Sequence, residues 1–484
     1  MEFVLDYYVF YLILGVAALS YLIFHKSIQH RHQPPLPPGS FGWPIVGETL
    51  ELQKLNRSGL QDEFMRRRML KHNKDIFKTS LIGEKVVVIC GSEGNKFLFT
   101  SEKKKLVLTW WPDSLKKLFG ESFFTAPYDD AIRTRKVVTA FLHQEVMNQF
   151  VEKFDKTCKT CFQSDWIGKD KVLAFELIKK YAFSIACEMF ASMGDPYWQE
   201  KILKEFNGLL KGVFALPIYF PGTRHYKAVR SAAVIHRELI KVINGKRRSR
   251  PRGSDNGGEV KDLISYLMDA RDENGEVLSD KVIVDNVILL MDAGHDTGAS
   301  AMMMLMKFLA ENPYCYQRVF EEQRGIALKK RAGELLNKDD IRKMKYSWNV
   351  VNEVLRLSPP IQGMFRKANA DFTYAGFSIP KGWKIWWNAT STHKVAEYFP
   401  NPQKFDPLRF DRDTITPYTF VPFGGGPRMC PGQEFARVEI LVFLHNLVKK
   451  FRWELLFPNE TIIVDPIPTS LKELPVYLYP HSGL

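Results

Sequence analysis

Cysteine is scarce in this sequence. Six cysteines among 484 residues, at scattered positions, are too few for the framework of a disulfide-rich secreted protein. Only one long apolar run is present, which excludes a polytopic membrane protein, and no repeat period is apparent. The fingerprint G-x-G-x-x-G after a predicted strand is also missing, so the chain has no dinucleotide site of its own. The remaining composition, 45% hydrophobic and 25% charged, is typical of a globular protein large enough for an extensive core.

Basic residues outnumber acidic ones, 68 to 54, which gives a formal net charge of +14. A positive excess is typical of proteins that bind a nucleic acid, an anionic membrane surface or an acidic protein. Net charge alone does not distinguish these three kinds of partner. The densest basic stretch, from Lys246 to Gly258, resembles a nucleic-acid patch. It is interleaved with Gly, Ser, Asp and Pro, which predicts a solvated loop and no nucleic-acid partner. Cys158 and Cys161 form a C-x-x-C pair without the second pair of ligands that a structural zinc site needs, so no zinc site is expected.

The single apolar run lies at the amino terminus, from Phe3 to Phe24, and carries one charge, Asp6. A helix of this length rises about 33 Å, enough to cross the ~30 Å hydrocarbon layer. A cleaved signal peptide is the alternative, but acidic residues precede the run where a basic segment is typical. We therefore expect a retained single-pass anchor. Lys26 and Arg31 follow the run, and positive charge there predicts that the rest of the chain faces the cytosol.

Three segments are predicted along the chain: a transmembrane anchor at 1–24, a hinge at 25–47, and one catalytic domain at 48–484. The hinge is basic at its start and then rich in proline, with the sequence QPPLPPGSFGWPIVG. Proline fixes φ and withholds an amide donor, so this segment is expected to be stiff and extended.

Long helical patterns dominate beyond the hinge and strand patterns are short, which predicts a mainly α fold with small β-sheets. A β-hairpin is expected at Phe77–Ile89, and further strands near Phe372–Ile379 and Lys384–Trp387. The predicted helices are Ala131–Asp155, Lys171–Ala191, Tyr226–Lys246, Glu259–Asp272, Ser279–Glu311 and Pro313–Lys330, with an apolar helical run from Glu434 to Phe451.

The sharpest motif is a glycine-rich loop around a cysteine, FGGGPRMCPG from Phe423 to Gly432. Glycines allow the backbone to approach a large flat ligand and to aim amides at one sulfur. Arg428 places fixed positive charge two residues before Cys430, and the helical run follows at once. A cysteine near a helix N-terminus, among amide donors, is stabilised as a thiolate, which is a strong metal ligand. With haem iron such a ligand favours cleavage of the O–O bond.

This loop resembles the cysteine-ligand loop of the cytochrome P450 family of haem-thiolate monooxygenases. The resemblance implies the P450 fold and haem b as cofactor, with Cys430 as the axial ligand of the iron. It also implies that Arg428 contacts a haem propionate and that the Phe423 ring packs near the sulfur. A buried structural cysteine in a glycine turn is the alternative, and further motifs argue against it.

Two more segments resemble the structural core of the same family. Glu353 and Arg356 form an E-x-x-R pair on one face of an amphipathic helix. The segment FDPLRF, which contains Arg409, is similar to the family's second arginine segment, although Leu408 stands where a glutamate is common. The resemblance implies a Glu353–Arg356–Arg409 cluster that braces the haem-side core, a structural role. Arg366, on the strand expected after SPP, is placed like another propionate contact.

One long predicted helix is interrupted by the polar segment Ala293–Thr297, AGHDT. An acid beside an alcohol is poor helix design, which predicts a loosened hydrogen-bond ladder here; a plain kink in a core helix is the alternative. The segment resembles the family motif that lies over the iron, opposite the thiolate. By that resemblance Asp296 passes protons and Thr297 steadies the oxygen ligand, so both are expected to be catalytic. His295 is expected to be a neighbour only, and Gly298 departs from the Ser or Thr common after the threonine.

A larger departure from the family lies upstream. Arg135 fits the basic end of the family's W/H-x-x-x-R haem contact and is expected to reach a propionate. Ala131 stands at the aromatic position, so one hydrogen bond to the haem is missing. This predicts looser haem binding from that side.

The resemblance covers nearly the whole chain and is closest to one plant branch. The stretches TWWPDSLKKLFG, WNATSTHKVAEYFPNPQKFDPLRF and PFGGGPRMCPGQEFARVEILVFLHNLVKKF resemble the branch that oxidises pentacyclic triterpenes such as β-amyrin, with taxane hydroxylases as near relatives. By family position the substrate pocket is expected to include Leu290, Ala293, Ile361, Met364, Phe365 and Thr469. These mostly apolar side chains suit a large hydrocarbon skeleton.

The resemblance implies a monooxygenase that inserts one atom of O2 into a C–H bond of an apolar terpenoid, foremost a pentacyclic triterpene. Electrons from NADPH would arrive through a separate NADPH–cytochrome P450 reductase, with the catalytic domain on the cytosolic side of the endoplasmic reticulum membrane. Three alternatives stay open: a taxane or sterol hydroxylase, a haem-thiolate isomerase or dehydratase, and a tethered binding protein without oxygen chemistry. Thr297 and the unaltered cysteine loop argue against the last two.

Overall fold

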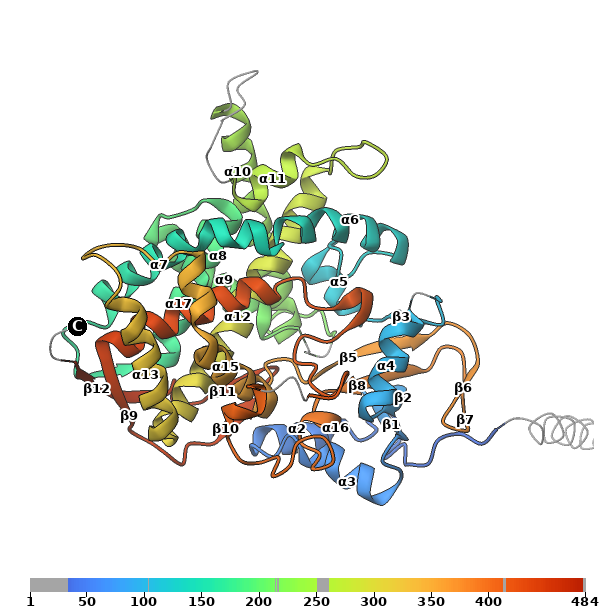
Figure 1. The fold of residues 1–484 in the computed structure, drawn as a ribbon. Helices are drawn as coiled ribbons and strands as arrows, with labels where there is room; N and C mark the ends of the chain where they lie inside the picture. Colours follow the sequence, from blue (N-terminus) through green and yellow to red (C-terminus); the bar gives the residue numbers. More distant parts are fainter. Residues whose placement is uncertain are drawn as a thin grey trace, which may run out of the picture.

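The computed structural model describes residues 34–102, 104–213, 215, 217–249, 261–411 and 415–481. Within these residues the chain is mainly helical, with a β-rich region at one side (Figure 1). The long helix α12 (Asp280–Glu311) runs through the helical region and packs against α8 (Ala174–Ala191) and α17 (Gln433–Lys450). The predicted mainly α fold with small sheets is confirmed.

The remaining elements are arranged around this centre and the sheet. The other helices are α2 (Thr49–Arg57), α3 (Glu63–Lys71), α4 (Gly91–Ser101), α5 (Asp113–Phe119), α6 (Tyr128–Phe141), α7 (Gln144–Asp165), α9 (Pro196–Leu210), α10 (Arg224–Ser249), α11 (Leu263–Asp269), α13 (Pro313–Ala327), α14 (Lys338–Lys343), α15 (Lys345–Leu357) and α16 (Thr390–His393), with the 3-10 turns η1 (Pro407–Phe410) and η2 (Gly426–Arg428). The strands are β1 (Ile76–Leu81), β2 (Glu84–Ile89), β3 (Val107–Thr109), β4 (Lys171–Leu173), β5 (Gly363–Ala368), β6 (Phe372–Tyr374), β7 (Phe377–Ile379), β8 (Lys384–Asn388), β9 (Phe451–Leu455), β10 (Ile462–Val464), β11 (Pro468–Ser470) and β12 (Pro475–Pro480).

Some predicted boundaries were wrong for local reasons. The helix predicted over Ala131–Asp155 is two helices, α6 and α7, because the backbone of His143 is extended at the N-cap of α7. The helix predicted over Lys171–Ala191 begins as strand β4, which pairs with β12. The helix predicted over Glu259–Asp272 is shortened to α11, whose N-cap Asp262 accepts a hydrogen bond from the Ser265 amide.

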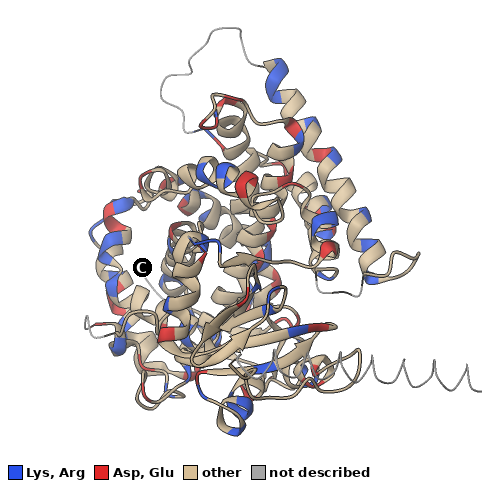
Figure 2. Cartoon of the chain, turned by 90° about the vertical axis from the view of Figure 1, so that its right-hand side faces the viewer, with Lys and Arg blue, Asp and Glu red and all other residues tan. Residues whose placement is uncertain are grey.

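The stretch predicted to be a basic loop begins as helix. Lys246 and Arg247 lie in the last turn of α10 and pair with Asp262 at 2.5 Å and Asp280 at 2.7 Å. Figure 2 shows Lys and Arg interspersed with Asp and Glu over most of the ribbon, with basic residues recurring along α10. These two basic side chains are therefore engaged in ion pairs within the protein.

The largest sheet has five strands in the order β1-β2-β8-β5-β3. Alternate residues face opposite sides, as strand geometry requires. Val86, Val88 and Trp386 pack on one side with Phe64 of α3, whereas Val87 and other residues pack on the opposite side under α4. The predicted hairpin at Phe77–Ile89 is the antiparallel pair β1 and β2 of this sheet, joined at Gly83. The sheet therefore separates two small cores, and α4 covers the one that faces the cysteine loop.

The described part of the predicted hinge lies against β1 of this sheet and against β7 of the separate two-stranded sheet β6–β7. The Lys78 amide donates to the Pro38 carbonyl at 2.8 Å, and the Ser378 amide donates to the Pro35 carbonyl at 2.9 Å. The predicted anchor at 1–24 and the first part of the hinge lie outside the described residues. Within the described ranges, no helix combines the length and hydropathy that a membrane span needs.

Candidate active site

The cysteine loop is closed on itself and held against α4. The Cys430 amide donates to the Phe423 carbonyl at 2.8 Å, which fixes the two ends of the motif. Gly424 and Gly426 have φ of +71° and +66°, a region that favours glycine. A Cβ on Gly425 or Gly426 would collide with Phe99 of α4. The glycines therefore allow the loop to pack closely against α4.

Cys430 is exposed although protein atoms surround it on several sides. Burial among these atoms raises the pKa of its thiol, while the Gly432 amide and the Arg135 guanidinium lower it. The residue therefore lies in a concave part of the structure. The helix α17 begins three residues later, so the sulfur lies near a helix N-terminus as predicted.

Helix α12 presents one open face in an otherwise buried element. Ala293 is exposed and Thr297, one turn later, is half-buried, whereas most other residues of α12 are buried. A Cβ on Gly294 would lie 3.4 Å from the Phe435 ring, and Phe435 is five residues after Cys430. This contact brings the open face of α12 close to the start of α17. The structure thus brings the two predicted motifs together.

The helix predicted over Ser279–Glu311 is confirmed, because α12 is continuous from Asp280 to Glu311. The Thr297 hydroxyl donates to the Ala293 carbonyl at 2.5 Å, four residues back. The loosened hydrogen-bond ladder expected at Ala293–Thr297 stays a prediction.

Asp296 points away from the face that carries Thr297. It is 4% exposed, its Oδ1 lies 3.4 Å from His295 Nε2, and its Oδ2 has no hydrogen-bond partner. Burial raises the pKa of Asp296 and of Asp292 one turn before it, and the charge of Asp296 raises the pKa of Asp292 further. His295, expected to be only a neighbour, donates from Nδ1 to the Met291 carbonyl at 2.7 Å.

Sequence reasoning also missed a buried acid on a neighbouring helix, Glu439 of α17. Its side chain is 0% exposed, neither carboxyl oxygen has a hydrogen-bond partner, and burial raises its pKa well above the ordinary value. The carboxyl group occupies the space beside Gly298, where a Cβ would collide with Oε2. Gly298 therefore replaces the usual Ser or Thr at a point where the structure has no room for a side chain.

Three arginines predicted as propionate contacts lie close to the cysteine loop. Arg428 Nε donates to Glu102 Oε1 at 2.7 Å, and Arg366 Nε lies 3.8 Å from the other oxygen of Glu102. Arg135 of α6 donates to the Met429 carbonyl, directly before the cysteine. Desolvation lowers the pKa of Arg366 to about 10, a group still charged at neutral pH. Glu102, at the end of α4, carries no signal in the sequence that would have identified it.

The predicted Glu353–Arg356–Arg409 cluster is assembled in the core behind this site. Arg356 makes a two-pronged contact to Glu353 at 2.7 and 2.8 Å, and both side chains are 0% exposed. Arg409 Nε lies 3.4 Å from the same carboxylate. Arg356 also donates to the His393 and Pro402 carbonyls at 2.7 and 2.8 Å. The cluster thus ties α15 to the segment that leads into the cysteine loop.

Most residues predicted for the substrate pocket lie around the open face of α12 and along β5. Leu290 is on the same face as Ala293, one turn earlier, although it is buried. Ile361 is 40% exposed at the start of the β5 segment, and Met364 is half-buried. Thr469 lies on β11, whose Pro468 carbonyl accepts a hydrogen bond from Ser300 of α12 at 2.7 Å.

Phe365 is the exception among the pocket residues. Its ring stacks on Trp386 at 5.8 Å and meets Trp110 edge-on at 6.0 Å, with the core on the far side of the sheet. Because side chains alternate along a strand, Met364 and Arg366 share one face of β5 and Phe365 points to the other. The expectation that Phe365 and Met364 line one pocket was therefore wrong.

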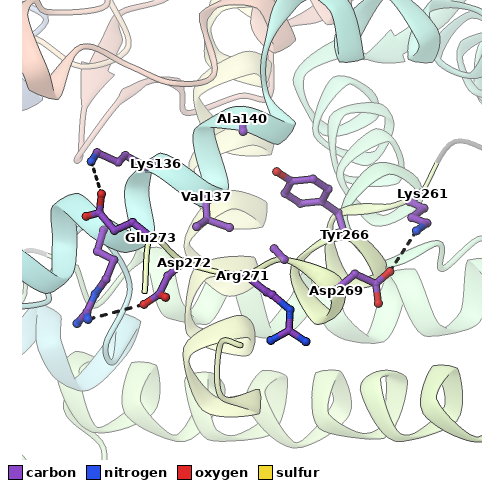
Figure 3. Close-up of a pocket in the computed structure, with 11 residues that line it drawn as sticks. Lys136, Val137, Ala140, Lys261, Tyr266, Asp269, Arg271, Asp272 and Glu273 are labelled. Carbon is purple, nitrogen blue, oxygen red and sulfur yellow. Dashed lines mark hydrogen bonds and ion pairs between the residues drawn. The ribbon is translucent and has the colours of Figure 1, made fainter. Parts of the chain in front are cut away.

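A separate recess of about 530 Å³ lies between α6 and the turn that follows α11 (Figure 3). Several of its charged side chains are paired, with Lys136 2.8 Å from Glu273 and Lys261 3.2 Å from Asp269. None of the predicted site residues lines it. The recess is not the candidate active site.

A haem group fits the residues around Cys430. Cys430 is exposed, and a cluster of arginines nearby has more positive charge than Glu102 neutralises. Cys430 would hold the iron, and Arg428, Arg366 and Arg135 would hold the propionates. Ala131 of α6 is 2% exposed and offers no hydrogen bond. When bound, the haem supplies the activation of O2 through its thiolate-ligated iron.

Comparison with known proteins agrees with this geometry. The Cytochrome P450 family profile matches residues 37–474. A beta-amyrin 28-monooxygenase from Kalopanax septemlobus is 46% identical over 472 residues, covering 97% of this chain and 98% of the relative, and one from Medicago truncatula is 45% identical over 479 residues, covering 99% of each. The structure of retinoic acid bound cyanobacterial CYP120A1 superposes with a TM-score of 0.83 at 32% identity, covering 93% of this chain and 100% of that one. The chain belongs to the cytochrome P450 family and is a haem-thiolate monooxygenase that receives its electrons from a reductase.

Proposed function

We propose that this monooxygenase oxidises a pentacyclic triterpene of the β-amyrin type. The observation that carries the proposal is the similarity, 46% identity over 97% of the chain, to a beta-amyrin 28-monooxygenase. The lining residues are compatible with such a substrate, because Leu290, Ala293, Ile361 and Met364 offer apolar contacts and few polar groups. A rigid hydrocarbon skeleton would be oriented mainly by shape in such a pocket.

The residues around the site would handle protons and exclude water. Thr297 carries a hydroxyl on the open face of α12 and is the group placed to hold a proton next to the oxygen chemistry. Asp296, a buried carboxyl group whose pKa is raised by burial, is placed to exchange protons from the buried side of the helix. The apolar residues exclude water, which would compete with the substrate.

We also propose an amino-terminal membrane anchor at 1–24, residence in the endoplasmic reticulum membrane with the catalytic domain in the cytosol, and NADPH–cytochrome P450 reductase as the electron donor. The apolar run Phe3–Phe24 and the basic residues after it support the anchor and its orientation. The stiff hinge, hydrogen-bonded to the sheet, would fix the tilt of the body against the membrane.

The test is co-expression of the full chain with a reductase and, in separate cultures, cyclases that supply β-amyrin, other pentacyclic triterpenes, a sterol and a taxane. We expect an oxidised β-amyrin product, with position 28 the first to be examined by mass spectrometry and NMR. Turnover of the sterol or taxane without any triterpene product would refute the proposed substrate class. Cys430→Ser is the control, because it should lose the thiolate-type band of the reduced, carbon-monoxide-bound protein together with all turnover.

A further inference from the structure

Glu102 lies in the middle of the arginine cluster and belongs to none of the motifs that mark the family. Its side chain is 2% exposed at the C-terminal end of α4. Its two carboxyl oxygens contact two different arginines, Arg428 at 2.7 Å and Arg366 at 3.8 Å. The shared carboxylate compensates the charges of both guanidinium groups, and each of the three charged groups would be costly to bury alone.

Surrounding groups fix the carboxylate in this place. The Thr109 hydroxyl lies 3.4 Å from Oε1, and the Tyr128 hydroxyl donates to the Glu102 backbone carbonyl at 3.4 Å. The Arg428 guanidinium also lies 5.5 Å from the centre of the Tyr128 ring. The acid is therefore held by β3 and α6 as well as by the arginines, and it cannot leave the cluster without breaking these contacts.

The charges of the cluster do not cancel. Arg135, Arg366 and Arg428 contribute three positive charges, and Glu102 contributes one negative charge, which leaves two positive charges uncompensated. A haem carries two propionates, each with one negative charge. The residual charge of the protein therefore equals that of the two groups that these arginines are expected to meet.

We propose that Glu102 is a positioning residue that sets the charge of the propionate site: it holds Arg428 and Arg366 facing one carboxylate and reduces three positive charges to the two that haem can neutralise. The proposal rests on the haem cofactor that the family implies, and not on the triterpene substrate. Its consequence is that the charge next to the haem, and with it the ease of iron reduction, depends on Glu102.

The test replaces Glu102 by glutamine in the full-length holoenzyme, which preserves the shape of the side chain and one acceptor oxygen and removes one negative charge. Loss of that charge favours the ferrous form, so we expect a shift in the ferric-to-ferrous equilibrium of about tenfold, or about 59 mV to more positive potential for one electron. Transfer of haem to excess apomyoglobin should become about threefold slower or more, because three unopposed arginines attract the propionates more strongly. Glu93→Gln is the matched control, since Glu93 is on the same helix, is exposed, and should change neither quantity.

Glu102→Asp, which keeps the charge, should restore both quantities toward wild type. An unchanged potential in Glu102→Gln, or faster haem loss without a change in potential, would overturn the proposal, because both results describe a purely structural residue. A thiolate-type spectrum in every variant, together with the triterpene assay, separates failure of this proposal from failure of the proposed function.

Discussion

Replacing Gly298 by alanine adds one methyl group where α12 crosses α17, and the structure predicts what that group meets. An ideal Cβ at this position collides with Oε2 of Glu439 and lies 3.2 Å from its Cδ. Glu439 is 0% exposed and its carboxyl oxygens have no hydrogen-bond partner, so the group has no contact with water toward which it could move. The added methyl group must therefore displace either the acid or the helix.

The size of the effect follows from two opposing contributions. Alanine in place of glycine in a helix interior stabilises by about 0.5–1 kcal/mol, whereas overpacking a close-packed core costs about 1–3 kcal/mol. We expect Gly298→Ala to lower the free energy of unfolding by about 1–2 kcal/mol. Gly245→Ala on α10 is the matched control, because no atom lies within 4 Å of its Cβ, and this substitution should stabilise the protein.

A double-mutant cycle shows whether the acid is responsible. Glu439→Ala removes the carboxyl group, so Gly298→Ala should cost little in that background and the coupling energy should be about 1–2 kcal/mol. Urea unfolding of the holoprotein, followed by far-ultraviolet circular dichroism and haem absorbance, measures all four variants. If Gly298→Ala stabilises as Gly245→Ala does, or costs the same without Glu439, then the contact derived from the structure is not the cause.

Two further predictions concern the core behind the site. Glu353→Ala should lower the unfolding free energy by about 3–5 kcal/mol in the same urea assay, because it leaves the fully buried Arg356 without a counter-charge. Glu200→Ala, which removes one partner of an exposed ion pair, is the control, and a loss no larger than the control's would contradict this prediction. Burial and Arg356 lower the pKa of His393 to about 3, so the unfolded chain binds the proton first and stability should fall as pH drops from about 6.5 towards 3, by at most about 1.4 kcal/mol per pH unit. His393→Gln should flatten that slope in urea unfolding at several pH values, while the exposed His143→Gln should leave it unchanged.

The motif residues could be located from the sequence because each lies within a short, recognisable sequence motif. Cys430 and Arg428 lie in one glycine-rich loop, and Glu353 and Arg356 lie one helical turn apart, so their relative places follow from short-range geometry. The hairpin at Phe77–Ile89 was identified for the same reason, since period-two alternation and a central glycine are local signals. Where a three-dimensional contact overrides a local pattern, as at the start of α8, where β4 pairs with β12, the prediction failed.

The sequence by itself determined the family, the thiolate-bearing loop and the mainly α class, because these depend on residue types at fixed spacings along one segment. Only the tertiary structure decided that Glu102 joins Arg366 and Arg428, three residues from widely separated parts of the chain, and that Glu439 fills the space beside Gly298. It also decided that Phe365 faces away from Met364's side of the sheet. The physical reason is that burial and charge pairing arise between segments distant in sequence, and no pattern within either segment records its partner.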